Sequence, residues 1–139
     1  MDKGSLLQLK RFHVDELRRR LGSLDGMRSG LEQNIRELET AITRERQRNP
    51  DSAIARLALP SIVEGIESRR KNLEKTRADL ERDRTALEAD LFNAMQELKA
   101  AESADEERRR RSAWASTTVA DYREKEQFAR RHLRRHATR

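Results

Sequence analysis

The chain has 139 residues, of which 40% are charged, 35% hydrophobic and only 4% aromatic, and it carries a formal net charge of +6. So few large apolar residues cannot build a thick globular core, and the lack of cysteine excludes a disulfide framework and a thiolate metal site. Disorder is the alternative for so charged a chain. The apolar residues are periodic, however, and this pattern favours long helices.

The charge is distributed unevenly along the chain. Residues 1–60 carry 12 basic and 9 acidic side chains (+3), residues 61–107 carry 8 and 13 (−5), and residues 108–139 carry 11 and 3 (+8). The start of the chain lacks the apolar region of a signal peptide, and no run approaches the ~18 apolar residues of a membrane span. We therefore expect a soluble cytoplasmic protein with a basic C-terminal arm.

A first helix is predicted over residues 5–48. Ser5 and Gln8 fit a capping box, in which each side chain satisfies a free amide of the other residue. Apolar residues then follow on alternating steps of three and four, the period typical of a seam between two helices. They occupy heptad positions a (Val14, Leu21, Ile35, Ile42) and d (Leu17, Leu24, Leu31, Leu38). Arg28 stands at a, where another apolar residue is expected.

Three glycines lie four residues apart in the middle of this helix: Gly22, Gly26 and Gly30. Each costs about 0.8–1 kcal/mol relative to alanine in a helix interior. Their heptad positions place them on the exposed face. We expect that a long helix simply tolerates these glycines or bends at them. The alternative is a smooth surface that another backbone approaches closely.

A loop is predicted over residues 49–60, because prolines follow Asn49 and Leu59. Proline removes a backbone donor and disfavours helix at the residue before it. A short helix over residues 51–58 fits between the two breaks, with Asn49 as its N-cap and Pro50 at its first position. Pro60 is expected to end it.

A second helix is predicted over residues 61–133, opening with a capping box at Ser61 and Glu64. Its seam is a ladder of apolar residues: Val63, Ile66, Leu73, Leu80, Leu87, Leu91, Ala94, Leu98 and Ala101. Three arginines occupy the companion seam position: Arg70, Arg77 and Arg84. We expect their stems to cover the seam while their charged heads reach water. Buried polar layers that keep the hairpin pliable are the alternative.

The two helices predict an all-α fold, an antiparallel two-helix coiled-coil hairpin in a single domain that spans residues 1–139. The turn lies near residue 55, so residue x faces about residue 110 − x. From about residue 106 the second helix has no partner, yet its apolar stripe continues: Ala115, Val119, Tyr122, Ala129 and Leu133. Trp114 and Phe128 lie on an adjacent line, two heptads apart. This overhang either frays or is covered by a partner.

Few motifs suggest chemistry. His132 and His136 have a spacing that can hold zinc, but no third ligand is near and arginines surround them. We expect no enzyme, no metal, no cofactor and no small-molecule substrate, since nothing builds a pocket in which acids gain shifted pKa values. The arginine clusters at 108–111 and 130–139 keep a nucleic-acid-binding hairpin as an alternative. A homodimeric structural coiled coil through the overhang is another, and direct membrane insertion is disfavoured.

Three blocks of sequence resemble the FliJ family of flagellar export proteins, especially its alphaproteobacterial branch. The first runs from Leu7 to Glu16 and reads LQLKRFHVDE, the second is RRKNL at residues 69–73 after Pro60, and the third is ELKAAE at 97–102 followed by DEER at 105–108. The resemblance covers about residues 5–112.

This resemblance implies a non-enzymatic stalk-like coiled coil of the flagellar type III export apparatus, at the inner face of the cell membrane. Its implied partners are the hexameric export ATPase, the membrane-embedded export gate and export chaperones, with membrane contact only through partners. By analogy with a stalk, the open end would enter the ATPase ring through Leu6, Leu9, Arg11, Phe12, Trp114, Tyr122, Phe128 and Leu133. The distal hairpin would offer the gate Arg44, Arg48, Arg69 and Arg70.

Overall fold

Two long helices make up the computed structural model, which describes residues 2–137. Helix α1 spans Lys3–Gln47 and helix α2 spans Ala53–Ala137, and residues 2–137 contain no strand. The chain forms two compact units, each described here by itself. The hairpin unit is Arg11–Met95, and the terminal unit is Met1–Lys10 with Gln96–Arg139.

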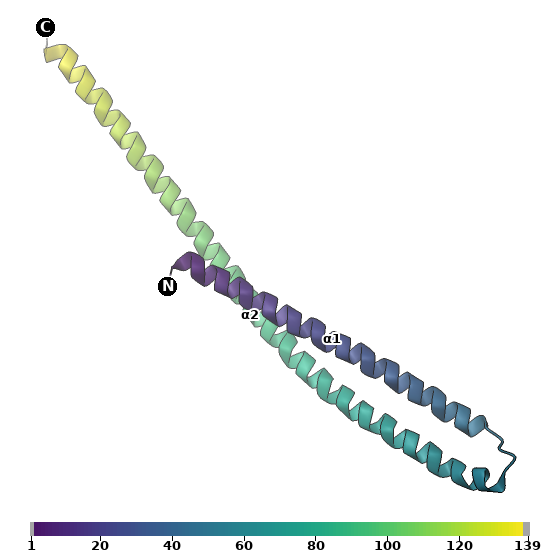
Figure 1. Cartoon of the computed structure of the whole chain (residues 1–139). Helices are drawn as coiled ribbons and strands as arrows, with labels where there is room; N and C mark the ends of the chain where they lie inside the picture. The colour runs from purple at the N-terminus through teal and green to yellow at the C-terminus, as the bar shows by residue number, and fades with distance from the viewer. Residues whose placement is uncertain (1, 138–139) are drawn as a thin grey trace. The chain divides into compact units, whose positions relative to one another are not determined.

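In the hairpin unit, α1 and α2 run antiparallel from the loop that joins them (Figure 1). The seam residues predicted from the heptad are the least exposed in both helices. Five apolar side chains of this unit are buried: Val14, Leu17, Ile35, Ile42 and Ala94. The remaining seam leucines are half-buried. A narrow seam between two helices leaves each core residue open at one side, so few reach full burial.

The predicted register is confirmed by three pairs of charged residues across the hairpin. Asp25 pairs with Arg84, Arg28 with Glu81, and Glu39 with Arg70, and the residue numbers of each pair add to 109. Leu17 and Ala94, expected to face one another, are both buried. The all-α two-helix hairpin predicted from the sequence is therefore the observed fold.

The predicted start of α1 at Ser5 is wrong by two residues. The amide of Leu6 donates to the backbone carbonyl of Asp2 at 3.0 Å, so the helix begins at Lys3 with Asp2 as its N-cap. Aspartate is itself a favoured N-cap residue, and it competes with Ser5 for this role. At the other end, the amide of Arg48 donates to the carbonyl of Glu45 at 3.2 Å, a tight closing turn.

The predicted loop over residues 49–60 is wrong in part. Residues 49–52 lie outside a helix, but the short helix expected over residues 51–58 is the start of α2, which begins at Ala53 and runs through Pro60 instead of ending there. Ser52, and not Asn49 or Ser61, caps this helix: its hydroxyl accepts from the amide of Ala55 at 3.4 Å. Pro60 lies in the second turn of helix rather than at its end. It deprives the carbonyl of Arg56 of its helical donor, but residues 51–58 are exposed and water can replace that donor.

In the terminal unit, the first turns of α1 pack on α2. Leu7 is buried, and the ammonium of Lys10 lies 3.6 Å from a carboxylate oxygen of Glu97. On α2 the half-buried positions recur through Asp105 and Arg108, after which every described side chain from 109 to 135 is exposed. The covered part of α2 therefore ends close to the predicted residue 106. The helix continues to Ala137, four residues beyond the predicted end.

We predict that Ile35→Ala lowers the free energy of unfolding by about 2 kcal/mol, because it leaves a void in the seam. Ile35 is 4% exposed. Met27→Ala serves as the control, since Met27 is 56% exposed and its loss should cost no more than ~0.5 kcal/mol. Urea unfolding followed by circular dichroism measures both. Equal effects would contradict the placement of the seam.

We predict that Gly22→Ala, Gly26→Ala and Gly30→Ala together stabilise the hairpin by about 2–3 kcal/mol. A methyl group added at any of the three would meet nothing within 4 Å, so only the gain in helix propensity remains. The same unfolding experiment measures the gain. A loss of stability would instead support the alternative interpretation of the glycine spacing, in which another backbone packs closely against this face.

Candidate interaction surfaces

One edge of the hairpin is closed by ion pairs, and we call it the paired edge. Positions e of the heptad flank the seam on this side. Four ion pairs cross between the helices in the described hairpin unit, and each includes an e residue: Asp25–Arg84, Arg28–Glu81, Glu39–Arg70 and Arg46–Glu67. The N···O distances are 2.6, 3.2, 3.8 and 2.5 Å in that order. Charged e positions commonly fix partner and orientation in coiled coils.

Two of the three seam arginines, Arg70 and Arg84, reach this paired edge. Arg70, Arg77 and Arg84 are half-buried, and no charged residue is fully buried in the part of the chain with described side chains. Arg84 donates through Nε to Asp25 at 2.6 Å and contacts Glu88 at 2.9 Å. The stem of Arg84 therefore covers the seam while its charged head lies at the rim, as expected from the length of the arginine side chain, whereas Arg70 keeps a buried Nε.

The hydrogen bond that Arg84 donates to Asp25 raises the pKa of the Arg84 guanidinium above its ordinary value. Burial opposes this shift, and the charges of Asp25, Glu88 and Glu81 support it. Because the folded pKa lies above the unfolded one, this stabilisation is complete below the unfolded pKa and is lost only as the pH rises through the folded value. Arg84 therefore remains charged at every ordinary pH.

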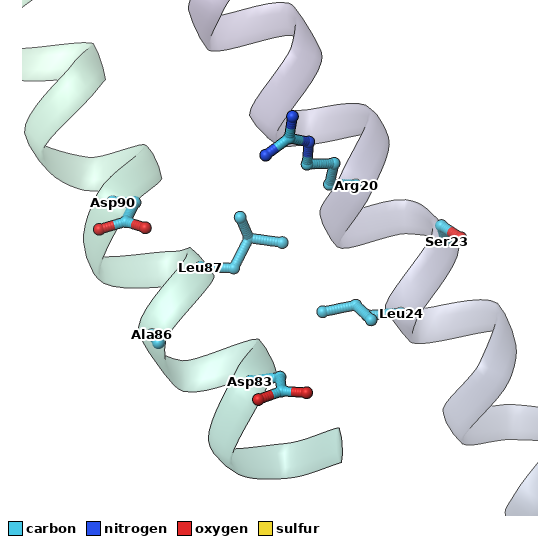
Figure 2. Close-up of a pocket in the computed structure, with 7 residues that line it drawn as sticks. All are labelled: Arg20, Ser23, Leu24, Asp83, Ala86, Leu87 and Asp90. Carbon is cyan, nitrogen blue, oxygen red and sulfur yellow. The ribbon is translucent and has the colours of Figure 1, made fainter. Parts of the chain in front are cut away.

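The opposite edge of the hairpin is hollowed, and we call it the open edge. Its first hollow has a volume of 380 Å³ and is lined by Arg20, Ser23, Leu24, Asp83, Ala86, Leu87 and Asp90. Figure 2 shows Leu24 of α1 and Leu87 of α2 pointing toward one another into this space. Its second hollow has a volume of 400 Å³ and is lined by Asn34, Glu37, Leu38, Arg69, Asn72 and Leu73.

The two hollows occupy equivalent places in the heptad. Both are lined by positions c, d and g of the two helices, and corresponding residues are 14 apart, as are Leu24 and Leu38. None of the four cross-helix ion pairs described above includes a g residue. The leucines at d, Leu24 with Leu87 and Leu38 with Leu73, line these hollows and are half-buried.

The exposed segment 109–135 of α2 is the other candidate surface. Its large apolar side chains are open to solvent: Trp114 is 72% exposed, Tyr122 69%, Phe128 72% and Leu133 68%. The ring of Phe128 stacks on His132 with centroids 6.4 Å apart. The heptad of α2 continues here, with Val119, Tyr122 and Leu133 on the same line as the seam leucines. This segment therefore extends the seam without a covering helix.

The residues predicted for the ATPase ring fall in both units. Leu6 and Leu9 belong to the terminal unit together with segment 109–135, and they are 44% and 52% exposed. Arg11 and Phe12 belong to the hairpin unit, where Phe12 is 58% exposed. All of these apolar side chains are accessible, and their role stays a prediction.

The residues predicted for the gate differ in availability. Arg44 and Arg69 are exposed, and Arg48 is exposed beside Glu45 at 3.6 Å. Arg70 is half-buried, lies 3.8 Å from Glu39, and has a buried Nε without a hydrogen-bond partner. Arg70 therefore belongs to the seam more than to an accessible surface.

Sequence reasoning missed several exposed apolar residues. Ile54 and Leu57 are each 81% exposed in the first turns of α2, near the loop, and Phe92 is 62% exposed on the hairpin. Ile54 and Leu57 lie three residues apart, on neighbouring turns of the helix that was predicted over residues 51–58. Their spacing within that predicted helix could have revealed them.

The fold defines this chain as an all-α two-helix antiparallel hairpin. Comparison with known proteins finds no matching family model, no matching curated protein and no matching solved structure. Within the described residues, no three histidine, cysteine or acidic side chains are grouped so as to hold a metal ion. In the same part of the chain, neither helix is apolar enough over a sufficient length to cross a membrane.

We predict that Asp25 and Arg84 are energetically coupled across the seam. A double-mutant cycle with Asp25→Asn and Arg84→Gln, read by thermal unfolding, should give a stabilising coupling that weakens as salt is added. The exposed intrahelical pair of Asp79 and Arg82 is the matched control and should show a smaller coupling. A coupling no larger than that of the control would show that the ion pairs of the paired edge do not help to fix the register.

Proposed function

We propose that this protein is a non-enzymatic, stalk-like component of the flagellar type III export apparatus that couples the export ATPase ring to the export gate. Support comes from the three sequence blocks that resemble the FliJ family, which occur in family order. It also comes from the antiparallel hairpin, the fold that this resemblance implied.

The observation that carries the proposal is the exposed apolar line of segment 109–135. An isolated helix with exposed Trp114, Tyr122 and Leu133 is marginal in water, and aromatic side chains of this kind are favoured anchors of interfaces. A ring-shaped partner that surrounds the segment would cover these side chains. Leu6 and Leu9, in the same unit, would add to the same contact.

The gate and the export chaperones are the further partners of the proposal. Arg44, Arg48 and Arg69 are exposed cations toward the loop end of the hairpin and would meet acidic surfaces of the gate. Contact with the gate would place the protein at the inner face of the cell membrane through a partner, without insertion of its own.

A nucleic-acid-binding hairpin is the second candidate, favoured by a pI near 10.3. Against it, several arginines of the basic clusters are tied to acids of the same helix. Arg110 lies 2.7 Å from Glu106, Arg111 lies 2.7 Å from Glu107, and Arg130 lies 2.9 Å from Glu126. These acids reduce the positive potential that phosphate binding requires.

We predict that Trp114→Ala with Tyr122→Ala weakens binding to the export ATPase by tenfold or more, about the loss of one or two interface anchors. Helix content should hardly change, because both side chains are exposed. Surface plasmon resonance with immobilised ATPase measures the affinity, and circular dichroism measures the helix content. Phe92→Ala, which removes an aromatic of the hairpin unit that is 62% exposed, is the control.

Unchanged binding by the double variant would remove segment 109–135 from the interface. A gel-shift titration with RNA at about 50 and 200 mM salt tests the second candidate, since phosphate binding should collapse over this range. Tight, steeply salt-dependent RNA binding together with no binding to the ATPase would overturn the proposed function.

A further inference from the structure

The two hollows of the open edge form a pair of receptor sites at a fixed spacing. Corresponding lining residues are 14 apart, from Leu24 to Leu38 on α1 and from Leu87 to Leu73 on α2. At ~1.5 Å per residue, this spacing corresponds to roughly 21 Å along the hairpin. A helix that docks here would need two bulky side chains at the same separation.

The chain itself carries such a pair of side chains. Trp114 and Phe128 are also 14 residues apart, on one line of α2, and each is 72% exposed. Both are large, rigid apolar groups of the kind that fills interface pockets. The spacing of the aromatics in segment 109–135 therefore equals the spacing of the hollows.

The charges around each site select the direction of docking. Asp83 and Asp90 rim the first hollow, and neither has an ion pair or hydrogen bond within the described chain. Arg110 and Arg111 lie one turn before Trp114. Each is 2.7 Å from an acid of its own helix, Glu106 and Glu107, and on docking would exchange that acid for Asp83 or Asp90, so Trp114 matches the first hollow. Phe128 then falls at the second hollow. Arg69 at this hollow also has no ion pair or hydrogen bond within the described chain, and it would face the carboxylate of Glu124.

The net charges of the two surfaces agree with this pairing. Segment 109–135 contains 9 basic and 3 acidic residues, a net charge of +6. Two such segments would repel each other side by side, which disfavours a dimer made by the exposed segments alone. The first hollow offers this segment two carboxylates and one arginine, Arg20, which is already held by Glu16 at 3.7 Å.

We propose that the open edge of the hairpin binds segment 109–135 of a second copy of this chain, with Trp114 in the first hollow and Phe128 in the second. The bound segment runs in the direction of α1 and forms a third helix over the exposed leucines of the seam. Self-association of this kind covers the aromatics of the segment while no other partner holds them. It does not depend on the proposed role in export.

The test uses the full chain and its single tryptophan as a reporter. Analytical ultracentrifugation over a wide range of protein concentration should show reversible self-association, as pairs or longer assemblies. The emission of Trp114 should shift to the blue over the same range, because docking removes the ring from water. A chain that stays monomeric, or that associates without a change in emission, overturns the proposal.

Two sets of variants locate the contact. Asp83→Arg with Asp90→Arg should weaken association by about tenfold or more, and adding Arg110→Glu with Arg111→Glu to the same chain should restore it. Glu64→Arg reverses an exposed carboxylate outside the hollows and should have no effect. Trp114→Phe should retain association, whereas Phe128→Ala should weaken it. Loss without restoration, or equal loss in the Glu64→Arg control, contradicts docking in the open edge.

Discussion

The structure depends on a mismatch between the apolar seams of its two helices. The helix α1 has 45 residues and α2 has 85, yet both carry the same heptad pattern along most of their length. Apolar burial stabilises a helix in water only where another helix covers the stripe. The seam is covered where α1 provides residues, from Leu7 to Ile42, and α2 continues as an exposed helix over residues 109–135. Stability and capacity for binding are thereby assigned to different parts of one helix.

The second constraint is the difference between the two edges of the hairpin. Charged residues at heptad positions e close one edge with ion pairs, and Arg28, Arg70 and Arg84 reach that edge from within the seam. The other edge has small or unpaired polar residues, such as Ser23 and Ala86, and leaves the paired leucines open. A hairpin with one closed and one open edge has a single direction from which a third helix can pack. The difference between the two edges follows from the residue types at heptad positions c, d, e and g.

Most of the fold could be predicted from the sequence, because a 3.5-residue period over many turns has one stable solution. The seam residues, the antiparallel register and the end of the covered region were all predicted in this way. The predicted helix end at Pro60 was wrong. The rule that proline breaks a helix interior does not take into account whether water can satisfy the freed carbonyl of Arg56. The hollows at Leu24 and Leu38 could not be predicted, because their size depends on how closely the helices approach. The roles of Trp114, Tyr122 and the loop-end arginines remain predictions, because the partner surfaces they would meet are not encoded in this chain.

The central claim is that α2 has tertiary support through about residue 108 and none beyond it in the isolated monomer. Amide hydrogen exchange, measured at a concentration where the chain is monomeric, tests this claim most directly because exchange reports local stability along a helix. The account predicts strong protection for residues 63–95 and a steep fall in protection after Arg108. Protection of residues 112–133 as strong as that of residues 73–91 in the monomer would contradict it.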